Sequence, residues 1–348
     1  MQDKKKIQVF DFFSGCGGTS QGFKQAGMEV VFGLDFDKEA SNTFQLNFPN
    51  AFFINDDITR LKVDCIKEIF GKSKKNQCYT LFSGCAPCQP FSTQNSKKSN
   101  SDPRRHLLGE FGRFVKSYHP DFVFIENVPG MQNLKGYSTP FFDFLSLLDE
   151  LGYQYSYGIV SAMWFGVPQD RKRLILLASK HTNISLPASS FDGIKKPYST
   201  VRDWIYELPE ISHGQEHANI PDHKSASLNA LSLLRIKQTP EGGGREDWQD
   251  NVKLKCHRHH NGHKDVYGRL SWDKPSSVLT TRCTSYSNGR FGHPEQDRAL
   301  SLREAALLQT FPMNYQFSGT FNSKAKQIGN AVPPLMSEAV GRHILSTF

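Results

Sequence analysis

Two cysteines in the segment Gly84-Cys-Ala-Pro-Cys-Gln-Pro-Phe-Ser92 follow a strand-like stretch directly. Such a pair can serve dithiol redox exchange, form half of a zinc site, or include one nucleophilic thiolate. A redox pair usually begins a helix, which Pro87 and Pro90 disfavour. A zinc site needs a second pair, and the candidates around Cys256 are remote in sequence. Our hypothesis is therefore that Cys88 is a nucleophile, with Cys85 packed behind it. A redox pair and half of a zinc site are the two alternatives.

Charged residues stand at the ends of two other apolar stretches. Glu126 ends the strand-like run Phe-Val-Phe-Ile, at the sheet edge where Cys88 is expected, and could hydrogen-bond or protonate a substrate nitrogen. Arg171 and Arg173 alternate before another strand, so an extended chain would project both to one side. They could meet a phosphate and a base carbonyl. An ordinary turn glutamate and a solvated charged face are the alternatives.

A glycine turn, Gly15-Cys-Gly-Gly18, separates a strand-like stretch from a helix-like one. Glycines there let a ligand approach the backbone beside a helix N-terminus. Asp35 follows Gly15 by 20 residues and could hold the hydroxyls of a ribose. The complete G-x-G-x-x-G pattern of dinucleotide enzymes is missing, which favours S-adenosylmethionine over NAD. A turn without a ligand is the alternative. Asp57 could likewise bind an adenine amino group or simply cap a helix.

The first half of the chain alternates strand-like and helix-like stretches, which predicts a mostly parallel α/β sheet. Acidic residues at the carboxyl ends of such strands face the usual ligand crevice. The predicted strands are residues 7–13, 29–34, 51–54, 79–83, 122–125 and 173–178, and the predicted helices end near 26 or cover 38–48, 141–151 and 302–308. Periodicity is weak over 181–268, which indicates a second, irregular domain.

Composition limits the class of protein. The 348 residues carry a formal net charge of +8, which favours a polyanionic partner. No apolar run is long enough to span a bilayer and no apolar signal region follows the basic start, so we expect no membrane association and a cytoplasmic location. The seven cysteines suggest no disulfide framework.

Six segments in order make the chain resemble the DNA (cytosine-5) methyltransferase family, in its bacterial restriction-modification form. They are Asp11-Phe-Phe-Ser-Gly-Cys-Gly-Gly18, Ala86-Pro-Cys-Gln-Pro-Phe-Ser92, Glu126-Asn-Val128, Gln169-Asp-Arg-Lys-Arg173, Arg303-Glu-Ala-Ala-Leu-Leu-Gln-Thr-Phe-Pro312 and Gln327-Ile-Gly-Asn-Ala-Val-Pro-Pro334. The resemblance covers nearly the whole chain except about 181–268, where the family places its variable target-recognition region.

The resemblance implies a Rossmann-like S-adenosylmethionine-dependent methyltransferase domain with a smaller, irregular target-recognition domain. We expect 1–180 and 320–348 to form the catalytic and cofactor-binding domain, and 181–319 to read DNA. The target cytosine would be flipped out of the duplex, because its ring carbons are unreachable in the stack. Cys88 would add to C6, Glu126 would hold the N3 and amino edge, and Arg173, with Arg171 nearby, would contact the O2 carbonyl while C5 takes the methyl group.

The same resemblance assigns binding residues. Positions matching the family's cofactor contacts are Phe13, Gly15, Gly17, Asp35, Phe36, Asp57, Ile58, Asn330 and Val332. The polar, basic segment 93–105 matches the loop that closes over DNA, and basic side chains suit phosphate contact. The expected DNA-binding residues are Gln89, Ser92, Lys97, Lys98, Arg104, Arg105, Arg269 and Arg282.

Several alternatives stay open. Pro90 stands where many family members carry Gly, and relatives that methylate tRNA carry a similar Pro-Cys-Gln-Pro, although they lack a long recognition region. A NAD-type oxidoreductase and a non-catalytic DNA-binding module are the rivals from other classes. The His-rich segment 256–263 could read DNA, and we expect no metal because it holds one cysteine. We expect a monomer acting on double-stranded DNA, with a possible companion restriction endonuclease that shares its target sequence without a stable complex.

Overall fold

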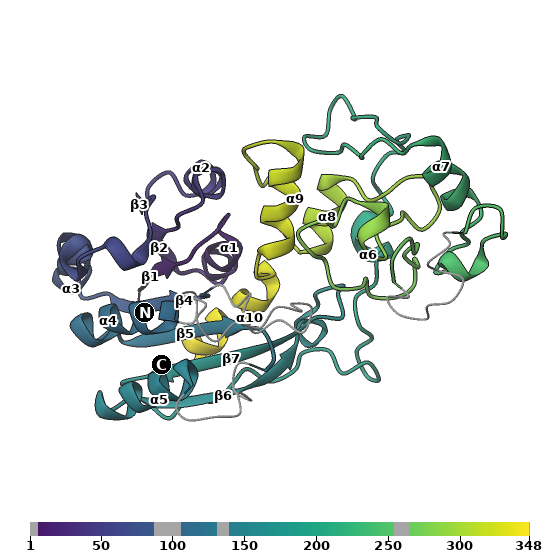
Figure 1. The fold of residues 1–348 in the computed structure, drawn as a ribbon. Coiled ribbons are helices and arrows are strands. Elements are labelled where there is room, and N and C mark those ends of the chain that lie inside the picture. The colour runs from purple at the N-terminus through teal and green to yellow at the C-terminus, as the bar shows by residue number, and fades with distance from the viewer. Residues whose placement is uncertain (1–5, 87–105, 131–138, 254–264, 348) are drawn as a thin grey trace. The chain divides into compact units, whose positions relative to one another are not determined.

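The structure is a computed structural model and describes residues 6–86, 106–130, 139–253 and 265–347 (Figure 1). The chain divides into two compact units. The first consists of Met1–Ser161, Lys172–Ser189 and Val332–Phe348, and the second of Ala162–Arg171 and Ser190–Ala331. Cys88 and six of the predicted DNA contacts lie outside the described residues: Gln89, Ser92, Lys97, Lys98, Arg104 and Arg105.

The first unit contains a seven-stranded sheet in the order β3-β2-β1-β4-β5-β7-β6. Strands β1 to β5 are parallel, and β7 is antiparallel to both β5 and β6. The strands are β1 (Ile7–Phe12), β2 (Glu29–Leu34), β3 (Phe52–Ile54), β4 (Tyr79–Gly84), β5 (Phe122–Asn127), β6 (Gln154–Ser161) and β7 (Lys172–Ser179). The prediction of a mostly parallel α/β sheet is confirmed.

Helices cover both faces of this sheet, because its central strands are apolar on both sides. Phe12 of β1 packs against Phe111 and Phe114 of α4 on one face, and Phe124 of β5 packs against Phe23 of α1 on the other. The helices of this unit are α1 (Gly18–Gln25), α2 (Lys38–Asn47), α3 (Lys67–Lys75), α4 (Leu107–Tyr118), α5 (Pro140–Glu150) and α10 (Pro334–Ser346).

Helices α1 and α10 approach each other closely at a glycine. A Cβ atom at Gly22 would lie 2.1 Å from the carbonyl oxygen of Pro334 and from Oγ of Ser337, so only glycine fits there. The C-terminal segment therefore packs beside the helix that follows the glycine turn.

The second unit has helices but, among its described residues, no named strand. Its helices are α6 (Arg202–Ile205), α7 (Ala230–Lys237), α8 (Leu302–Leu308) and α9 (Phe321–Asn330). A small core forms around Ile236, Trp248 and Tyr286. Glu304 is buried, and both of its carboxylate oxygens accept hydrogen bonds of 2.7 Å from Arg298. A paired, hydrogen-bonded buried charge of this kind can fix an irregular chain in one conformation.

The chain segments of the two units differ from the expected grouping. Residues 162–171 and 320–331, which we had grouped with the catalytic part, belong to the second unit. Strand β6 was not predicted, and neither were helices α3, α4, α6, α7, α9 and α10. In the described part of the chain, no helix combines the length and apolar character needed to cross a membrane.

Candidate active site

The glycine turn follows β1 and leads into α1. Phe13, Gly15 and Gly17 have positive φ angles of 59°, 52° and 90°, so the chain reverses sharply here. The two glycines adopt this left-handed conformation without the steric cost that a Cβ atom brings. A Cβ atom built at Gly15 meets no atom within 4 Å, so open space adjoins the turn.

Asp35, at the end of β2, is tied to this turn. Its Oδ2 accepts a hydrogen bond of 2.8 Å from the backbone N–H of Gly15, and its Oδ1 accepts one of 2.8 Å from Asp37. Phe36 follows with 68% of its surface exposed, which is unusual for a large aromatic side chain. The turn, an anchored carboxylate and an exposed ring together fit the ribose and the flat base of an adenosyl group.

Asp57 and Ile58, also predicted to bind the cofactor, lie after β3. Oδ1 of Asp57 accepts hydrogen bonds of 2.9 Å from the N–H and the hydroxyl of Thr59, so it caps the short helix Ile58–Arg60. Ile58 is buried. The capping alternative for Asp57 is therefore present, and a cofactor contact by these two residues stays a prediction.

Cys85 lies just beyond β4, with its Sγ 3.6 Å from the hydroxyl of Thr19 and 4.0 Å from that of Ser83. Burial, and then the negative charges of Glu126 and Asp11, raise the pKa of the Cys85 thiol far above its ordinary value. A thiol with so high a pKa is not a nucleophile at neutral pH. Cys85 therefore behaves as a packed, protonated thiol.

The chain that leads to Cys88 is anchored beside Glu126. Asn127 donates a hydrogen bond of 3.1 Å from its amide to the carbonyl of Ala86, the last described residue before Cys88. Since Glu126 is the neighbour of Asn127 on β5, the start of the cysteine segment and the predicted base-binding carboxylate belong to one sheet edge.

Glu126 forms an ion pair with Arg173, with Oε1 2.8 Å from Nε. Both side chains are largely buried. The pair is possible because β7 runs antiparallel to β5 and places Leu174 opposite Asn127. The beginning of β7 thus meets the end of β5, and a carboxylate and a guanidinium come together at this edge.

Arg171 has a different environment from the one the sequence suggested. Its side chain is 4% exposed and belongs to the second unit. The guanidinium donates hydrogen bonds of 3.3 Å to the backbone carbonyls of Leu279 and Ala331. These partners are protein groups, and a substrate contact by Arg171 or by Arg173 stays a prediction.

The two C-terminal cofactor residues lie on either side of a unit boundary. Asn330 is the exposed last residue of α9 in the second unit, and Val332 is buried in the first. Their contact with a cofactor stays a prediction.

A family model for C-5 cytosine-specific DNA methylases matches residues 7–346. The chain belongs to this family. It is thus a DNA (cytosine-5)-methyltransferase, which confirms the family and enzyme class predicted from the six segments.

Individual relatives agree with this membership. The type II methylase M.HgiDII of Herpetosiphon aurantiacus is 37% identical over 346 residues, which cover 97% of this chain and 94% of the relative. The type II methyltransferase M1.HphI of Haemophilus parahaemolyticus is 31% identical, with 97% and 87% covered. A crystal structure of a prophage-encoded DNA modification methyltransferase from E. coli has the same fold, with a TM-score of 0.70 at 24% identity, covering 98% of this chain and 99% of that one.

The two described candidates for DNA contact in this methyltransferase differ sharply. Arg269 is 4% exposed, and its guanidinium donates to four backbone carbonyls and to the carboxylate of Asp297. These bonds hold the interior of the second unit together, and a DNA contact by Arg269 stays a prediction. Arg282 is exposed, its guanidinium donates a hydrogen bond of 3.4 Å to Oδ1 of Asn288, and it stays a candidate.

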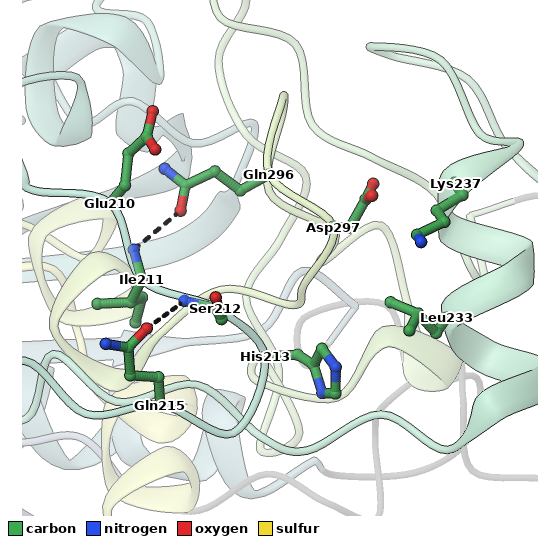
Figure 2. A pocket seen from close by; sticks show the side chains of 9 residues that line it. All are labelled: Glu210, Ile211, Ser212, His213, Gln215, Leu233, Lys237, Gln296 and Asp297. Atoms are coloured by element: carbon green, nitrogen blue, oxygen red, sulfur yellow. Dashed lines mark hydrogen bonds between the residues drawn. The ribbon is translucent and has the colours of Figure 1, made fainter.

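A pocket of about 570 Å³ lies within the second unit, and none of the predicted site residues lines it, although Arg269 donates hydrogen bonds to its lining residues Gln296 and Asp297 (Figure 2). Figure 2 shows Asp297 and Lys237 on one side of it and Glu210 on the other. Its loop residues are fixed by hydrogen bonds, such as that of Ile211 N–H to Gln296. Two carboxylates in the lining make the pocket unsuited to a phosphate or another anion.

Sequence reasoning missed one buried acid beside the glycine turn. Asp11 of β1 is fully buried, and its Oδ2 accepts a hydrogen bond of 2.6 Å from the hydroxyl of Ser20. Burial raises the pKa of Asp11 to about 7, although hydrogen bonds from Ser20 and Ser83 oppose the rise. A carboxyl group inside an otherwise apolar strand was the available signal.

Proposed function

We propose that this enzyme transfers a methyl group from S-adenosylmethionine to C5 of a flipped-out cytosine in a specific double-stranded DNA sequence, through a covalent adduct of Cys88 with C6. The observation that carries this proposal is the Glu126–Arg173 ion pair beside the anchored start of the cysteine segment. A cytosine ring presents an amino group, a ring nitrogen and a carbonyl oxygen along one edge. A carboxylate and a guanidinium side by side match that edge.

Each residue has a part in this reaction. The thiolate of Cys88 forms a bond to C6, and the electron pair of the C5–C6 double bond becomes available at C5. Glu126, in its protonated form, donates its proton to N3 and accepts from the amino group with its other oxygen, while Arg173 donates to the O2 oxygen, so that the developing negative charge on the ring is offset. After C5 has taken the methyl group it loses its proton to a water molecule, the electron pair of that C–H bond re-forms the C5–C6 double bond, and the bond from C6 to Cys88 breaks to release the thiolate.

S-adenosylmethionine supplies an electrophilic methyl group when bound. The residues proposed to hold it are the Phe13–Gly17 turn, Asp35 and Phe36, with Asp57, Ile58, Asn330 and Val332 from the resemblance. Asp35 is already oriented by the N–H of Gly15, so the carboxylate is fixed before a ribose arrives. A pre-oriented group loses less conformational entropy on binding than a free one.

The second unit is proposed to read DNA, together with the basic segment 93–105. Arg282 is its described candidate for a phosphate or base contact. We further propose that the enzyme works as a cytoplasmic monomer and is the modification enzyme of a type II restriction-modification system. A companion endonuclease would act on the same sequence without a stable complex. The naming of two relatives as type II enzymes supports this context.

The deciding experiment incubates the purified protein and S-adenosylmethionine with unmethylated genomic DNA, followed by deamination sequencing at base resolution. Modification at one short recurring sequence is the expected result, and Cys88→Ala should abolish it. If the folded protein binds S-adenosylmethionine but leaves every cytosine unmodified, DNA is refuted as the substrate. The same assay on total RNA would then test the tRNA alternative.

A further inference from the structure

Three buried side chains of the second unit, Gln169, Arg171 and Gln309, converge on the backbone near Ala331; we call them the Ala331 clamp. The carbonyl of Ala331 accepts two hydrogen bonds, one of 2.7 Å from Nε2 of Gln309 and one of 3.3 Å from Nη2 of Arg171. Gln309 and Gln169 are fully buried, and Arg171 is 4% exposed. Water therefore cannot easily replace these donors.

The clamp is a connected network. Nε2 of Gln169 donates a hydrogen bond of 2.6 Å to Oε1 of Gln309, and Nε2 of Gln309 also donates one of 2.9 Å to the carbonyl of Ile328. Oε1 of Gln169 accepts from the N–H of Leu279 at 3.1 Å. Both amide orientations are fixed by these partners, because a flipped amide would set oxygen against oxygen. The hydrogen bonds of such a buried network strengthen one another.

The clamp joins two stretches of chain that carry proposed functional residues. Ala331 lies between Asn330 and Val332, both proposed to contact the cofactor. Arg171 lies two residues before Arg173, proposed to contact the base, and its own carbonyl accepts a hydrogen bond of 2.8 Å from Ala162. One guanidinium thus connects the start of the strand bearing Arg173 with the segment bearing the cofactor residues.

We propose that Arg171 is a positioning residue, which sets the backbone of residues 328–331 for cofactor binding and does not itself touch the substrate. This inference rests on the proposed function and replaces the catalytic part first expected for Arg171. Gln309, which the sequence analysis left without a role, acts on the same carbonyl and has the same task.

The test compares Arg171→Lys with wild type. Lysine keeps the charge, but its single ammonium cannot reproduce the planar fork that reaches two separate carbonyls. Isothermal titration with S-adenosylmethionine and with S-adenosylhomocysteine gives cofactor Kd, steady-state assays give kcat and KM, and hydrogen exchange reports the amides of residues 328–332. We expect the Kd and KM for the cofactor to rise about tenfold and kcat at saturation to change less than about threefold, as for loss of one charge-assisted hydrogen bond. Exchange at these amides should accelerate.

Arg202→Lys is the matched control. Arg202 is also an arginine of the second unit, but it is partly exposed and pairs with Asp273 at 2.6 Å. This variant should leave Kd, kcat and the exchange of residues 328–332 unchanged.

A second variant, Gln309→Met, keeps the volume of the side chain and removes both donors to the 328–331 backbone. It should show the same rise in cofactor Kd and the same faster exchange, and it decides the question alone if Arg171→Lys does not fold. In the double variant the effects should be less than additive, because both residues act on one carbonyl.

The outcomes separate the inference from the proposed function. A fall in kcat with unchanged cofactor Kd would show that Arg171 touches the reacting base and would overturn the positioning assignment. Unchanged cofactor binding in both variants would also overturn it. If folded wild-type protein bound neither S-adenosylmethionine nor S-adenosylhomocysteine, the proposed function itself would fail.

Discussion

Arg173 pairs with Glu126 across neighbouring antiparallel strands, Nε to Oε1 at 2.8 Å, with both side chains largely removed from solvent. The guanidinium of Arg173 thus lies beside the Glu126 carboxylate. A buried ion pair is weak evidence for stability, because desolvation offsets much of the Coulomb attraction. Its position at the end of β5 therefore points to chemistry.

Glu126→Gln tests that chemistry. The amide is isosteric, but it cannot give a proton to N3 as the base becomes electron-rich, so we expect kcat to fall about 10²-fold or more while DNA binding is kept. Rates and DNA affinity are measured by tritium transfer and by fluorescence anisotropy. Glu338→Gln is the control, since Glu338 is also a partly buried glutamate paired with an arginine, Arg342, one turn along α10. Near-normal kcat in Glu126→Gln would contradict the assignment.

The two neighbouring cysteines should respond differently to substitution. Cys88→Ser should lose methyl transfer and keep DNA binding, because a hydroxyl is a far weaker nucleophile than a thiolate. Cys85→Ser should keep most activity, because Cys85 is a protonated thiol packed against Thr19. Covalent trapping with 5-fluorocytosine DNA, read on a denaturing gel, gives an independent readout. Trapping by Cys88→Ala, or its loss in Cys85→Ser alone, would reverse the two roles.

Asp11 should make folding stability depend on pH. Burial raises its pKa from 3.8 to about 7 in the native state. Between pH 4 and 7 the native state thus holds a proton that the unfolded state has released, so the free energy of unfolding falls as pH rises through this window. Each pKa unit corresponds to about 1.4 kcal/mol.

Asp11→Asn carries a neutral group at every pH and should remove this dependence. We expect the free energy of unfolding of the variant, relative to that of wild type, to increase from pH 5 to pH 8. Urea unfolding at both pH values measures it. Asp121→Asn is an informative comparison, because hydrogen bonds from Lys74, Thr80 and His181 outweigh burial there and lower the pKa. An equal loss of stability at both pH values in Asp11→Asn would contradict the raised pKa.

Substitution of the two arginines of the second unit that were expected to bind DNA should have different effects. Arg282→Ala should weaken DNA binding and reduce the salt dependence of the affinity by about one unit of slope, because one exposed cation is lost. Arg269→Ala should chiefly lower thermal stability, since five acceptors lose their shared donor. Salt titrations and calorimetry distinguish these effects. An unaltered affinity of Arg282→Ala at low salt would remove it from the interface.

Local patterns predicted the strands of the sheet well where apolar runs were continuous. Residues 29–34 match β2, and most other predicted strands match within one or two residues. Strand β6 escaped notice because Gln154, Ser156 and Gly158 interrupt its apolar residues. It lies at the sheet edge and is exposed over much of its length, so it needs no continuous apolar face.

The different surroundings of the predicted arginines have one physical origin. The spacing of Arg171 and Arg173 gives the direction of a side chain but not the element it meets, so one arginine reached Glu126 and the other a backbone carbonyl. A basic composition likewise cannot tell an exposed Arg282 from a buried Arg269. Partners far apart in sequence decide both cases, and only the folded chain brings them together.

The reversed direction of β7 determines which part of the chain can vary without disturbing the sheet. In a wholly parallel sheet, the start of that strand would lie at the opposite edge, roughly 17 Å from Glu126 for a five-residue span. Because β7 is reversed, Ser161 and Lys172 adjoin at one edge, and residues 162–171 leave and rejoin the sheet there. Within that segment, residues 163–168 can change in length or sequence while the hydrogen-bond ladder and the clamp residues Gln169 and Arg171 stay in place. The sheet thus acts as a constant frame, and sequence preference can diverge in the grafted parts without a new catalytic edge having to evolve.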